Sequence, residues 1–523
     1  MQKLDCRNGP GNKGRFNLFF QLSRSAAPTP RDGVLMPRKK KQPVAKKPRI
    51  LVHDLTRYGG VLSHGYSPGM IAALQTRGLV LSGSHAFCVS ADGDEEAVVR
   101  SYVRDYLLGR LGGIGVSPDS LVFLPPGKSM LSSLLDSPLA SAVRRGMQIR
   151  PYDPLEPALG EWRDGNPAAD VFAPDPFTAI QWGDKASFAL LLERSGWGAM
   201  LPESVDNDRL CLTAEDAYGR TRRLLDSGHL VVKVLSDTSA ASGEGGDTWT
   251  LADPASVSLK GVKFLTEAAF HKAVSKWREG RLQDGVHPYR VEVWHVGALP
   301  FSVTWTIHEG RVGFKGLTVQ EEAPTKDGCL ANKGNITSRR FENVVPWQWC
   351  VENTLTAKAV ADAIRLFVRR TERTVLRKMR ETGISKGSVN LDGIIWLDAG
   401  GLKSGWTDPN IRDGGSLFTR SHGHGEVRRV NGGRVAPHDR VVGNFYLHVP
   451  SSVSFSECVQ RLEEVSEFSE PISHPINGSL HPWAMLGMPL GPQQAEMIMV
   501  IPSAPDMRSY TDLRQQVEQA LRF

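Results

Sequence analysis

Hydrophobic and polar positions alternate along the chain in two patterns, one typical of strands and one typical of helices. Residues 50–54 form a short apolar run that predicts a first buried strand. Residues 95–111 carry apolar side chains at helical spacing, and residues 120–124 predict another strand. Because the two element types alternate, we expect a small α/β domain over residues 50–150.

Residues 151–176 are rich in Pro, Asp and Gly and show no periodicity, so we expect an irregular linker there. A larger unit is expected over residues 177–430, followed by a small α+β extension over residues 431–523. The elements predicted in these two units are helices over 185–194, 354–380, 455–468 and 510–521, and strands over 230–235, 391–397 and 496–501, with two more strands within 290–307 joined by a turn at Gly297.

The composition places the chain among globular proteins with several domains. It has 523 residues, of which 40% are hydrophobic and 23% charged. The sequence contains no apolar run of roughly 18 residues, the length that a membrane span needs, and its start is too polar for a secretory signal, so we expect a cytoplasmic protein with no membrane partner. The six cysteines are scattered, which predicts reduced thiols rather than a zinc site or a disulfide framework.

The net charge of +7 is unevenly distributed. Residues 1–49 carry a net charge of +11, and the remaining 474 residues carry −4. We expect residues 1–49 to form a disordered basic tail, because residues 36–49 combine Pro with clustered Lys. A solvated arm is the simpler interpretation, and contact of the tail with nucleic acid is the alternative.

Phosphate chemistry is indicated first by Lys233, which interrupts an apolar strand. Removing an ammonium from water is unfavourable unless an anion compensates it, and a structural ion pair is the alternative explanation. A loop of small residues follows at 241–246 and includes Ser242, Gly243 and Gly245. Such a loop lets several backbone amides turn toward one anion. A strand lysine followed by this loop is suited to a triphosphate.

Oxygen ligands for a hard cation are indicated farther along the chain. Asp392 lies in a predicted strand, and Asp408 and Asn410 are two residues apart, so their side chains point to the same side of an extended segment. Carboxylate and amide oxygens suit Mg²⁺, which takes its remaining ligands from phosphate and water. Arg412 on that side would face the charge of a transferring phosphoryl group. An ordinary Asp/Asn/Gly turn is the alternative.

The order of these motifs resembles that of the ATP-grasp ligases. The matching parts are the helix start Asp184-Lys185, the strand lysine, the Gly/Ser loop, a hinge strand and a terminal acidic-x-Asn-x-Arg motif. The segments Val232-Lys233 with 242–245, and Asn410-Ile411-Arg412 with 413–415, are similar to signatures of the pheganomycin-type peptide ligases. This resemblance implies an α/β protein, α+β in parts, with an ATP-grasp fold, a preceding pre-ATP-grasp domain and a C-terminal extension.

The resemblance also implies cofactors and roles. ATP and Mg²⁺ are the implied cofactors, and the implied reaction joins an amino-acid or peptide carboxylate to an amine through an acylphosphate, with the loop at 241–246 acting as a lid. The implied ligands of the nucleotide and its phosphates are Lys185, Lys233, Ser242, Gly243, Gly245 and Glu292, with Glu292 at the adenine hinge. The implied ligands of Mg²⁺ are Asp392, Asp408 and Asn410. Arg412 is implied to contact phosphate or the intermediate, and Lys233 and Arg412 are the implied catalytic residues.

The sequence departs from this family at several of its motifs, and two of these departures bear most on activity. Asp408 stands where the family usually has Glu, and Ser416-Leu417-Phe418 replaces the usual threonine-histidine pair. Two alternatives therefore accompany the ligase hypothesis: an ATP-binding protein of the same fold with no or altered ligase activity, and a nucleic-acid-binding protein acting through the basic tail. The sequence carries no signal for the oligomeric state.

Overall fold

The fold is known from a computed structural model. The chain divides into two units, Met1–Lys46 and Lys47–Phe523, and all the residues that the structure describes belong to the second. The predicted basic tail thus lies outside the described residues, apart from Arg49. The structure describes residues 49–53, 68–76, 78–79, 86–91, 93–110, 118–125, 130–152, 158–204, 210–236, 248–252, 266–279, 289–324, 330–414, 440–450, 452–465, 483–487 and 497–522.

The first sheet is parallel, and its strands lie in the order β3-β2-β1-β4-β5. Ile50 pairs with Ala86 on one side and with Ile149 on the other. The order in which successive strands are added to the sheet therefore reverses between β1 and β4. The carboxyl ends of strands at such a reversal are the place where α/β sheets usually bind ligands. The strands are β1 (Arg49–Val52), β2 (Ala86–Ser90), β3 (Leu121–Leu124), β4 (Gln148–Pro151) and β5 (Asp170–Val171); the helices are α2 (Pro68–Thr76), α4 (Gly93–Ser101), the π-helix η1 (Tyr102–Arg110), the 3₁₀ turn η2 (Pro118–Ser120), α5 (Met130–Leu134) and α6 (Ala140–Arg144).

The segment 151–176 is not the irregular linker that its composition predicts. It contains helix α7 (Ala158–Gly165) and strand β5, which pairs in parallel with β4 through Gln148 and Ile149. Strand β5 has two residues, too few to show a hydrophobic period in the sequence. The other predicted elements of this region, β1, α4 with η1, and β3, are confirmed.

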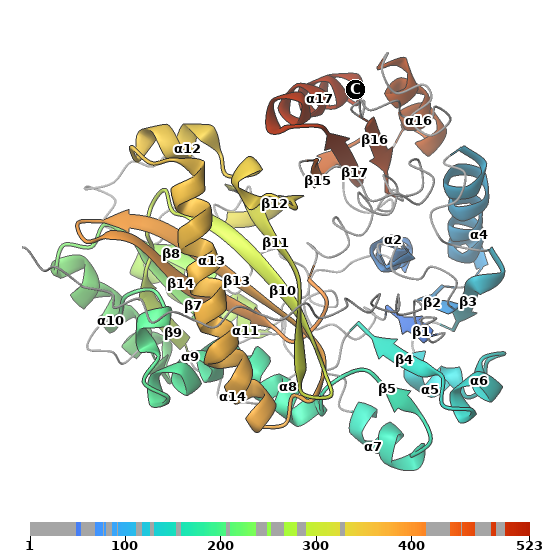
Figure 1. The fold of residues 1–523 in the computed structure, drawn as a ribbon, viewed down its shortest axis with the longest axis horizontal. Helices are drawn as coiled ribbons and strands as arrows, with labels where there is room; N and C mark the ends of the chain where they lie inside the picture. The colour runs from blue at the N-terminus through green and yellow to red at the C-terminus, as the bar shows by residue number, and fades with distance from the viewer. Residues whose placement is uncertain are drawn as a thin grey trace, which may run out of the picture. The chain divides into compact units, whose positions relative to one another are not determined.

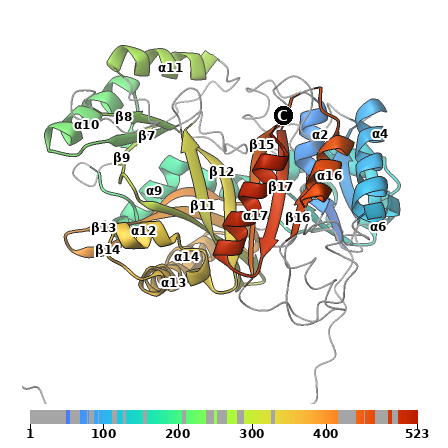
Figure 2. The same cartoon turned by 90° about the horizontal axis from the view of Figure 1, so that it is seen from above.

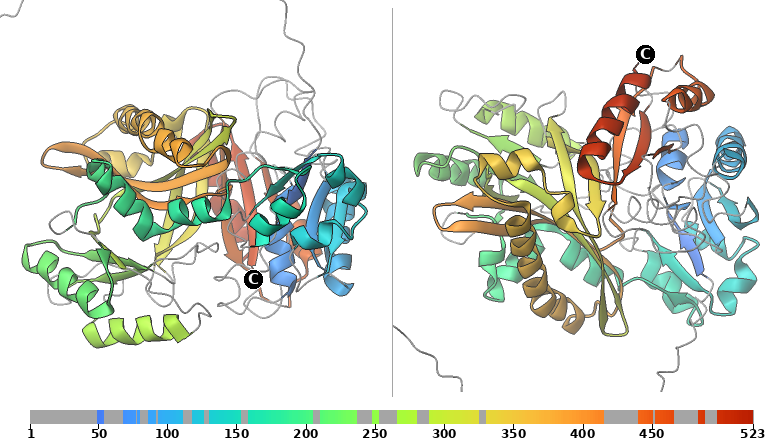
Figure 3. Two further views of the ribbon diagram at one scale, coloured as in Figure 1. Left: turned by 90° about the horizontal axis from the view of Figure 1, so that it is seen from below. Right: turned by 45° about the horizontal axis from the view of Figure 1, so that its top comes forward.

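A small antiparallel sheet follows, with strands in the order β6-β9-β7-β8. Helices α10 and α11 pack on it through a core that includes Leu224, Val234 and Phe270 (Figure 3). The predicted strand at 230–235 is confirmed as β7. The elements are β6 (Leu210–Cys211), α10 (Ala214–Asp226), β7 (Val232–Ser236), β8 (Thr248–Leu251), α11 (Glu267–Glu279) and β9 (Tyr289–Val293).

The large sheet is antiparallel and eight-stranded, in the order β14-β13-β10-β11-β12-β15-β17-β16. The two strands expected within 290–307 are confirmed as β9 and β10, but they belong to different sheets. Gly297, with φ of 75°, lies in the connection that crosses from one to the other. The strands are β10 (Leu299–His308), β11 (Arg311–Pro324), β12 (Leu330–Ser338), β13 (Lys386–Asp398), β14 (Gly401–Asn410), β15 (Val441–His448), β16 (Trp483–Leu486) and β17 (Met497–Ala504).

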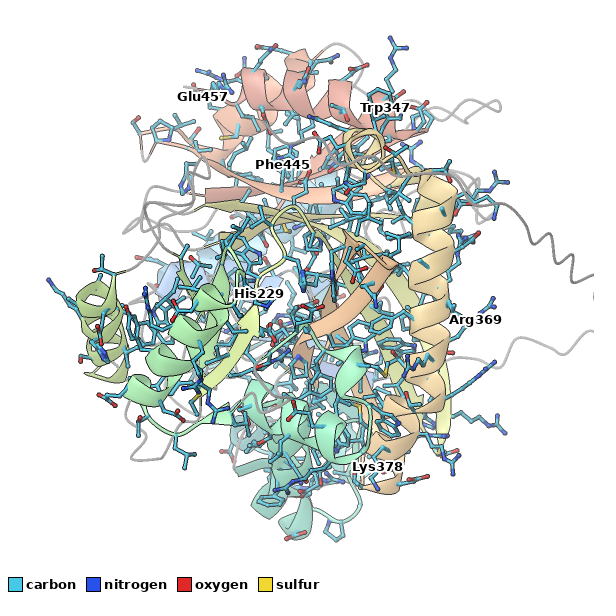
Figure 4. All side chains as sticks on the ribbon, turned by 90° about the vertical axis from the view of Figure 1, so that its left-hand side faces the viewer. His229, Trp347, Arg369, Lys378, Phe445 and Glu457 are labelled. Atoms are coloured by element: carbon cyan, nitrogen blue, oxygen red, sulfur yellow. The ribbon has the colours of Figure 1, made fainter. Side chains whose placement is uncertain are left out.

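Helices α13 and α14 cover one face of the large sheet (Figure 1). Their apolar side chains pack with Trp305 and Trp406, while Arg369 points away from the sheet (Figure 4). The predicted helix over 354–380 is in fact two helices, because Thr374 leaves helical geometry with φ −113° and ψ −80°. The helices of this unit are α8 (Pro176–Gly183), α9 (Lys185–Arg194), the 3₁₀ turn η3 (Gly198–Met200), the 3₁₀ turn η5 (Phe341–Asn343), α12 (Trp347–Glu352), α13 (Ala357–Arg373) and α14 (Val375–Glu381).

The C-terminal strands continue the large sheet instead of forming a sheet of their own (Figure 2). Ile336 of β12 pairs with Gly443 of β15. Helices α16 (Phe455–Glu464) and α17 (Met507–Ala520) confirm the predicted helices. Tyr102 of η1 donates to the carbonyl of Leu486 at 3.1 Å, so the extension is also attached to the first sheet's helices.

Two sequence predictions concern the chain as a whole. No helix in the described ranges combines the length and apolar character that a membrane span requires. Four cysteines fall within these ranges, and all four are buried: Cys88, Cys211, Cys350 and Cys458.

Candidate active site

Two predicted cation ligands face each other across a pair of strands in the large sheet. Asp392 of β13 lies opposite Asp408 of β14, and Asn410 lies opposite Asn390. Because alternate side chains of a strand share a face, Asp408 and Asn410 point to one side, as their spacing predicts. The register shifts between Asp392 and Gly393, so the carboxylates sit next to a bulge. Bulges of this kind locally change the direction of side chains.

Both oxygens of the Asp392 carboxylate accept hydrogen bonds from amides. Asn390 donates through Nδ2 to Oδ1 at 3.0 Å, and Asn410 donates through Nδ2 to Oδ2 at 3.2 Å. A carboxylate can only accept, so both amides must turn their NH₂ groups toward it. The three side chains therefore form one connected group.

Two hydroxyl groups of the neighbouring strand β10 donate hydrogen bonds to this group. Ser302 and Thr304 of β10 donate to Oδ1 of Asn390 at 2.9 and 2.7 Å. They lie opposite Asp392 and Asn390 in the ladder, and both are buried. Sequence reasoning missed Asn390. The signal that could have found it is the polar position two residues before Asp392 in an otherwise apolar strand.

The surroundings of Asp392 act on the pKa of its carboxyl in opposite directions. Burial raises the pKa of this carboxyl, although hydrogen bonds from Asn390 and Gln320 and the charge of Arg412 act in the opposite direction. A positive group bound next to Asp392 would lower this pKa.

Lys185 approaches the same site from a helix. Asp184 caps α9 by accepting from the backbone amides of Ala186 and Ser187, which sets Lys185 at the first helical position. The lysine side chain is 6% exposed, and its Nζ lies 3.8 Å from Oδ2 of Asp408. The structure thus brings together two residues that are far apart in the sequence.

Lys233 and Glu292 lie on neighbouring strands of the small sheet. They are direct partners in the ladder of β7 and β9. Lys233 is not the buried ammonium that its apolar strand predicts, because its side chain is partly exposed and its Nζ lies 5.6 Å from the centre of the Trp294 ring. Glu292 is 1% exposed. The two side chains are therefore close, with different access to solvent.

Arg290 connects the two sheets, and sequence reasoning missed it. This arginine is fully buried, and its Nη2 lies 2.5 Å from Oε2 of Glu292. It also donates to the backbone carbonyls of Trp406 and Thr407 at 3.0 and 3.1 Å. These carbonyls directly precede Asp408. One guanidinium thus ties the strand that carries Glu292 to the strand that carries Asp408.

Arg412 lies where the large sheet meets the first sheet. Its Nη1 donates to the hydroxyl of Tyr152 at 3.0 Å. Next to it, Arg150 contacts Asp413 at 2.5 Å and Ser388 at 3.0 Å. Tyr152 and Arg150 come from the end of β4, at the carboxyl edge of the parallel sheet. Two small cavities at this edge share Arg150, Pro151 and Asp413 in their lining.

Three predicted residues of the Gly/Ser loop, Ser242, Gly243 and Gly245, lie outside the described residues, and their roles stay predictions. Among the residues that the structure does describe, no three His, Cys, Asp or Glu side chains form a group that could hold a metal ion. The candidate set of two carboxylates and one amide oxygen still fits Mg²⁺, which keeps waters and phosphate oxygens as its other ligands.

Comparisons with known proteins were made against families, curated proteins and solved structures. No protein-family model matches the chain, and no curated protein matches it. Among solved structures, carboxyaminoimidazole ribonucleotide synthase from Aspergillus clavatus, complexed with ATP, matches 91% of this chain and 98% of its own with 10% identity and a TM-score of 0.50. L-amino acid ligase from Bacillus licheniformis matches 91% of this chain and 98% of its own with 13% identity and a TM-score of 0.45.

The similarity to the Aspergillus structure concerns the fold. The chain has the ATP-grasp fold, in which a parallel sheet comes first in the sequence and a large antiparallel sheet follows. This confirms the predicted fold class. At 10% identity this similarity does not extend to the reaction. The closeness to pheganomycin-type peptide ligases remains a prediction from the sequence motifs.

Proposed function

We propose that the protein is an ATP-dependent ligase that joins a carboxylate to an amine. The observation that carries the proposal is the group formed by Asp392, Asp408 and Asn410, with the Nζ of Lys185 3.8 Å from Asp408, in a chain with the ATP-grasp fold. Oxygen ligands beside a lysine ammonium suit a cation that carries a polyphosphate. The Aspergillus structure with the same fold is described as complexed with ATP.

The chain's residues divide the work of binding Mg²⁺ and ATP. Asp392, Asp408 and the amide oxygen of Asn410 would hold the cation, which supplies charge neutralisation at the phosphates. Lys185 and Lys233 would bind phosphate oxygens, and Glu292 on β9 would lie at the adenine end. Arg290 supports this arrangement, because it joins Glu292 to the carbonyls before Asp408.

The proposed reaction has two steps. A substrate carboxylate oxygen attacks the γ-phosphorus of ATP, forming an acylphosphate while ADP leaves. An amine nitrogen then attacks the acyl carbon and loses a proton, and phosphate leaves as the amide forms. Arg412 would stabilise the negative charge of the transferring phosphoryl group. The loop at 241–246 would exclude water from the acylphosphate.

We propose amino acids or short peptides as the substrates. This choice rests on the sequence similarity of segments 232–233, 242–245 and 410–415 to the peptide ligases. Arg150, Arg412 and Tyr152 line the carboxyl edge of the parallel sheet, where a substrate carboxylate could meet a guanidinium.

The test is mass spectrometry of the products formed from ATP and Mg²⁺ with a mixture of amino acids and short peptides, alongside an ADP-release assay. An amide product formed with stoichiometric ADP supports the proposal. Nucleotide binding measured by titration calorimetry, with no turnover across the panel, would favour the ATP-binding alternative. A carboxylated or phosphorylated product would assign a different reaction to the same fold.

A further inference from the structure

We infer that Asn390 is a positioning residue of the cation site, and this inference rests on the proposed function. Asn390 holds Oδ1 of Asp392 in a fixed hydrogen bond, so that Oδ2 is the oxygen available to the cation. The amide of Asn390 takes part in more hydrogen bonds than that of Asn410 on the opposite strand.

Hydrogen bonds on both sides fix the direction of the Asn390 amide. The residue is 3% exposed, and its Oδ1 accepts from the hydroxyls of Ser302 and Thr304. Its Nδ2 donates to Asp392 at 3.0 Å. If the amide turned over, its oxygen would face a carboxylate oxygen, and two acceptors would meet at hydrogen-bond distance. Asn390 therefore presents its donor to Asp392 and its acceptor to β10.

The Asn390 side chain is closely packed on the side of Gly414. The backbone of Gly414, two residues after Arg412, lies directly against it. A Cβ added to Gly414 would lie 2.3 Å from Oδ1 and 2.5 Å from Cγ of Asn390. Only glycine fits at this position without displacing the amide. The turn that follows Arg412 thus closes over Asn390.

Asn410 meets the same carboxylate from a partly exposed position. It donates through Nδ2 to Oδ2 of Asp392 at 3.2 Å. A cation is bound by the amide oxygen and not by the nitrogen, so ligation requires the Asn410 amide to turn over. Oδ2 then loses this donor and turns to the cation, while Asn390 keeps Oδ1 in place.

The experiment compares ADP affinity with and without Mg²⁺ by titration calorimetry, in the wild-type chain and in Asn390→Leu. The ratio of the two affinities measures how well the cation site works. We expect Asn390→Leu to lower this ratio by at least about tenfold, the effect of losing one charge-assisted hydrogen bond. ADP affinity without Mg²⁺ should stay within about twofold, which general damage to the structure would not allow.

The matched control is Asn444→Leu, the same change at a buried asparagine in β15, with three strands between it and β13. It should leave the Mg²⁺ ratio unchanged. An unchanged ratio in Asn390→Leu, or an equal fall in Asn444→Leu, overturns the inference while the proposed function stands. A wild-type chain whose ADP binding does not depend on Mg²⁺ overturns both.

A second variant keeps the test decisive if Asn390→Leu does not fold by circular dichroism. Thr304→Val retains Asn390 but removes one of the hydroxyls that hold its amide. We expect the Mg²⁺ ratio to fall by at least about threefold in this variant, because loosening the amide costs part of one hydrogen bond. An unchanged ratio in a folded Thr304→Val chain overturns the inference.

Discussion

At the level of single residues, the candidate site combines buried and partly buried polar side chains that are connected to one another. Asp392 takes part in hydrogen bonds with two amides, and Asp408 contacts Lys185. In a low-dielectric interior such contacts are stronger than in water, and losing one partner leaves the other costly to bury. Even a small change to one of these side chains should therefore strongly reduce the function of the site.

Lys185→Ala should lower the rate of ADP release about 100-fold, equivalent to about 2.7 kcal/mol, because a phosphate ligand next to the cation site is lost. ADP release measured at saturating Mg²⁺ gives this value. Lys403→Ala is the control, since Lys403 also lies 3.8 Å from a carboxylate, that of Asp398, but on the half-exposed hairpin β13–β14. Equal rates in wild type and Lys185→Ala would remove this lysine from the mechanism.

His295 predicts a dependence of stability on pH. Burial, and secondly the neighbouring charge of His229, lower the pKa of its imidazole to about 4, with Asp398 acting in the opposite direction. In the unfolded chain this histidine binds its proton near pH 6.5. The free energy of unfolding should therefore be independent of this group above that pH and should fall as the pH drops toward 4. With allowance for the partly exposed ring, the loss should be about 1–2 kcal/mol.

Urea unfolding at pH 7.5 and pH 5 measures this loss, with His295→Gln as the variant. Between these two pH values, the free energy of unfolding of the variant should fall by about 1–2 kcal/mol less than that of wild type, because glutamine does not titrate. His308→Gln, an exposed histidine on β10, is the comparison and should behave like wild type. The same pH response in His295→Gln and wild type would contradict the assignment.

At the scale of elements, the strands of the small and large sheets are joined by Arg290. Its guanidinium contacts Glu292 on its own strand and two carbonyls of β14. Both side chains of the ion pair are at most 1% exposed, so neither can be solvated by water if the other is removed. This connection sets the position of β9 against β14, the strand that carries Asp408 and Asn410.

Arg290→Met should destabilise the fold by about 3–5 kcal/mol, because it leaves Glu292 as a buried charge without its partner. The double variant Arg290→Met with Glu292→Leu should recover most of this loss, since a pair of apolar side chains can replace a buried ion pair. Denaturant unfolding of the two single variants and the double variant gives the coupling free energy. Additive losses would show that the pair is not coupled.

Sequence patterns located elements well where the signal is local. The helix start at Asp184-Lys185 and the spacing of Asp408 and Asn410 needed only their neighbours, and the structure has both. Asn390 and Arg290 were missed because their importance comes from residues on other strands, such as Thr304 and Trp406, whose pairing no local pattern encodes. The break at Thr374 was missed for a related reason: threonine carries a weak helix signal, and the packing of two helices on the sheet decides.

At the scale of the whole molecule, the candidate site draws on all three sheets. Arg150 and Tyr152 come from the parallel sheet, Lys233 from the small sheet, and Asp392 from the large one. Contacts between these parts, such as those of Arg412 with Tyr152 and of Arg150 with Asp413, lie next to the proposed cation ligands. The residues before Lys47 form a separate unit that carries much of the basic charge.

Removing residues 1–46 should leave Mg²⁺-dependent ADP affinity within about twofold of the wild-type value, because the described site residues all lie beyond the tail. The same truncation should abolish any binding to single-stranded RNA, which in the full chain should weaken steeply as salt rises. Fluorescence anisotropy across a salt series measures the second effect. Loss of Mg²⁺-dependent ADP binding on truncation would contradict this separation of roles.

The most direct test of the proposed reaction follows the oxygen of the substrate carboxylate. Once a substrate pair is found, the carboxylate is labelled with heavy oxygen, and the released phosphate is analysed by mass spectrometry. An acylphosphate intermediate transfers one labelled oxygen from the carboxylate to the phosphate. The account predicts this label in the phosphate formed with each ADP. Unlabelled phosphate accompanying ADP and amide formation would contradict it.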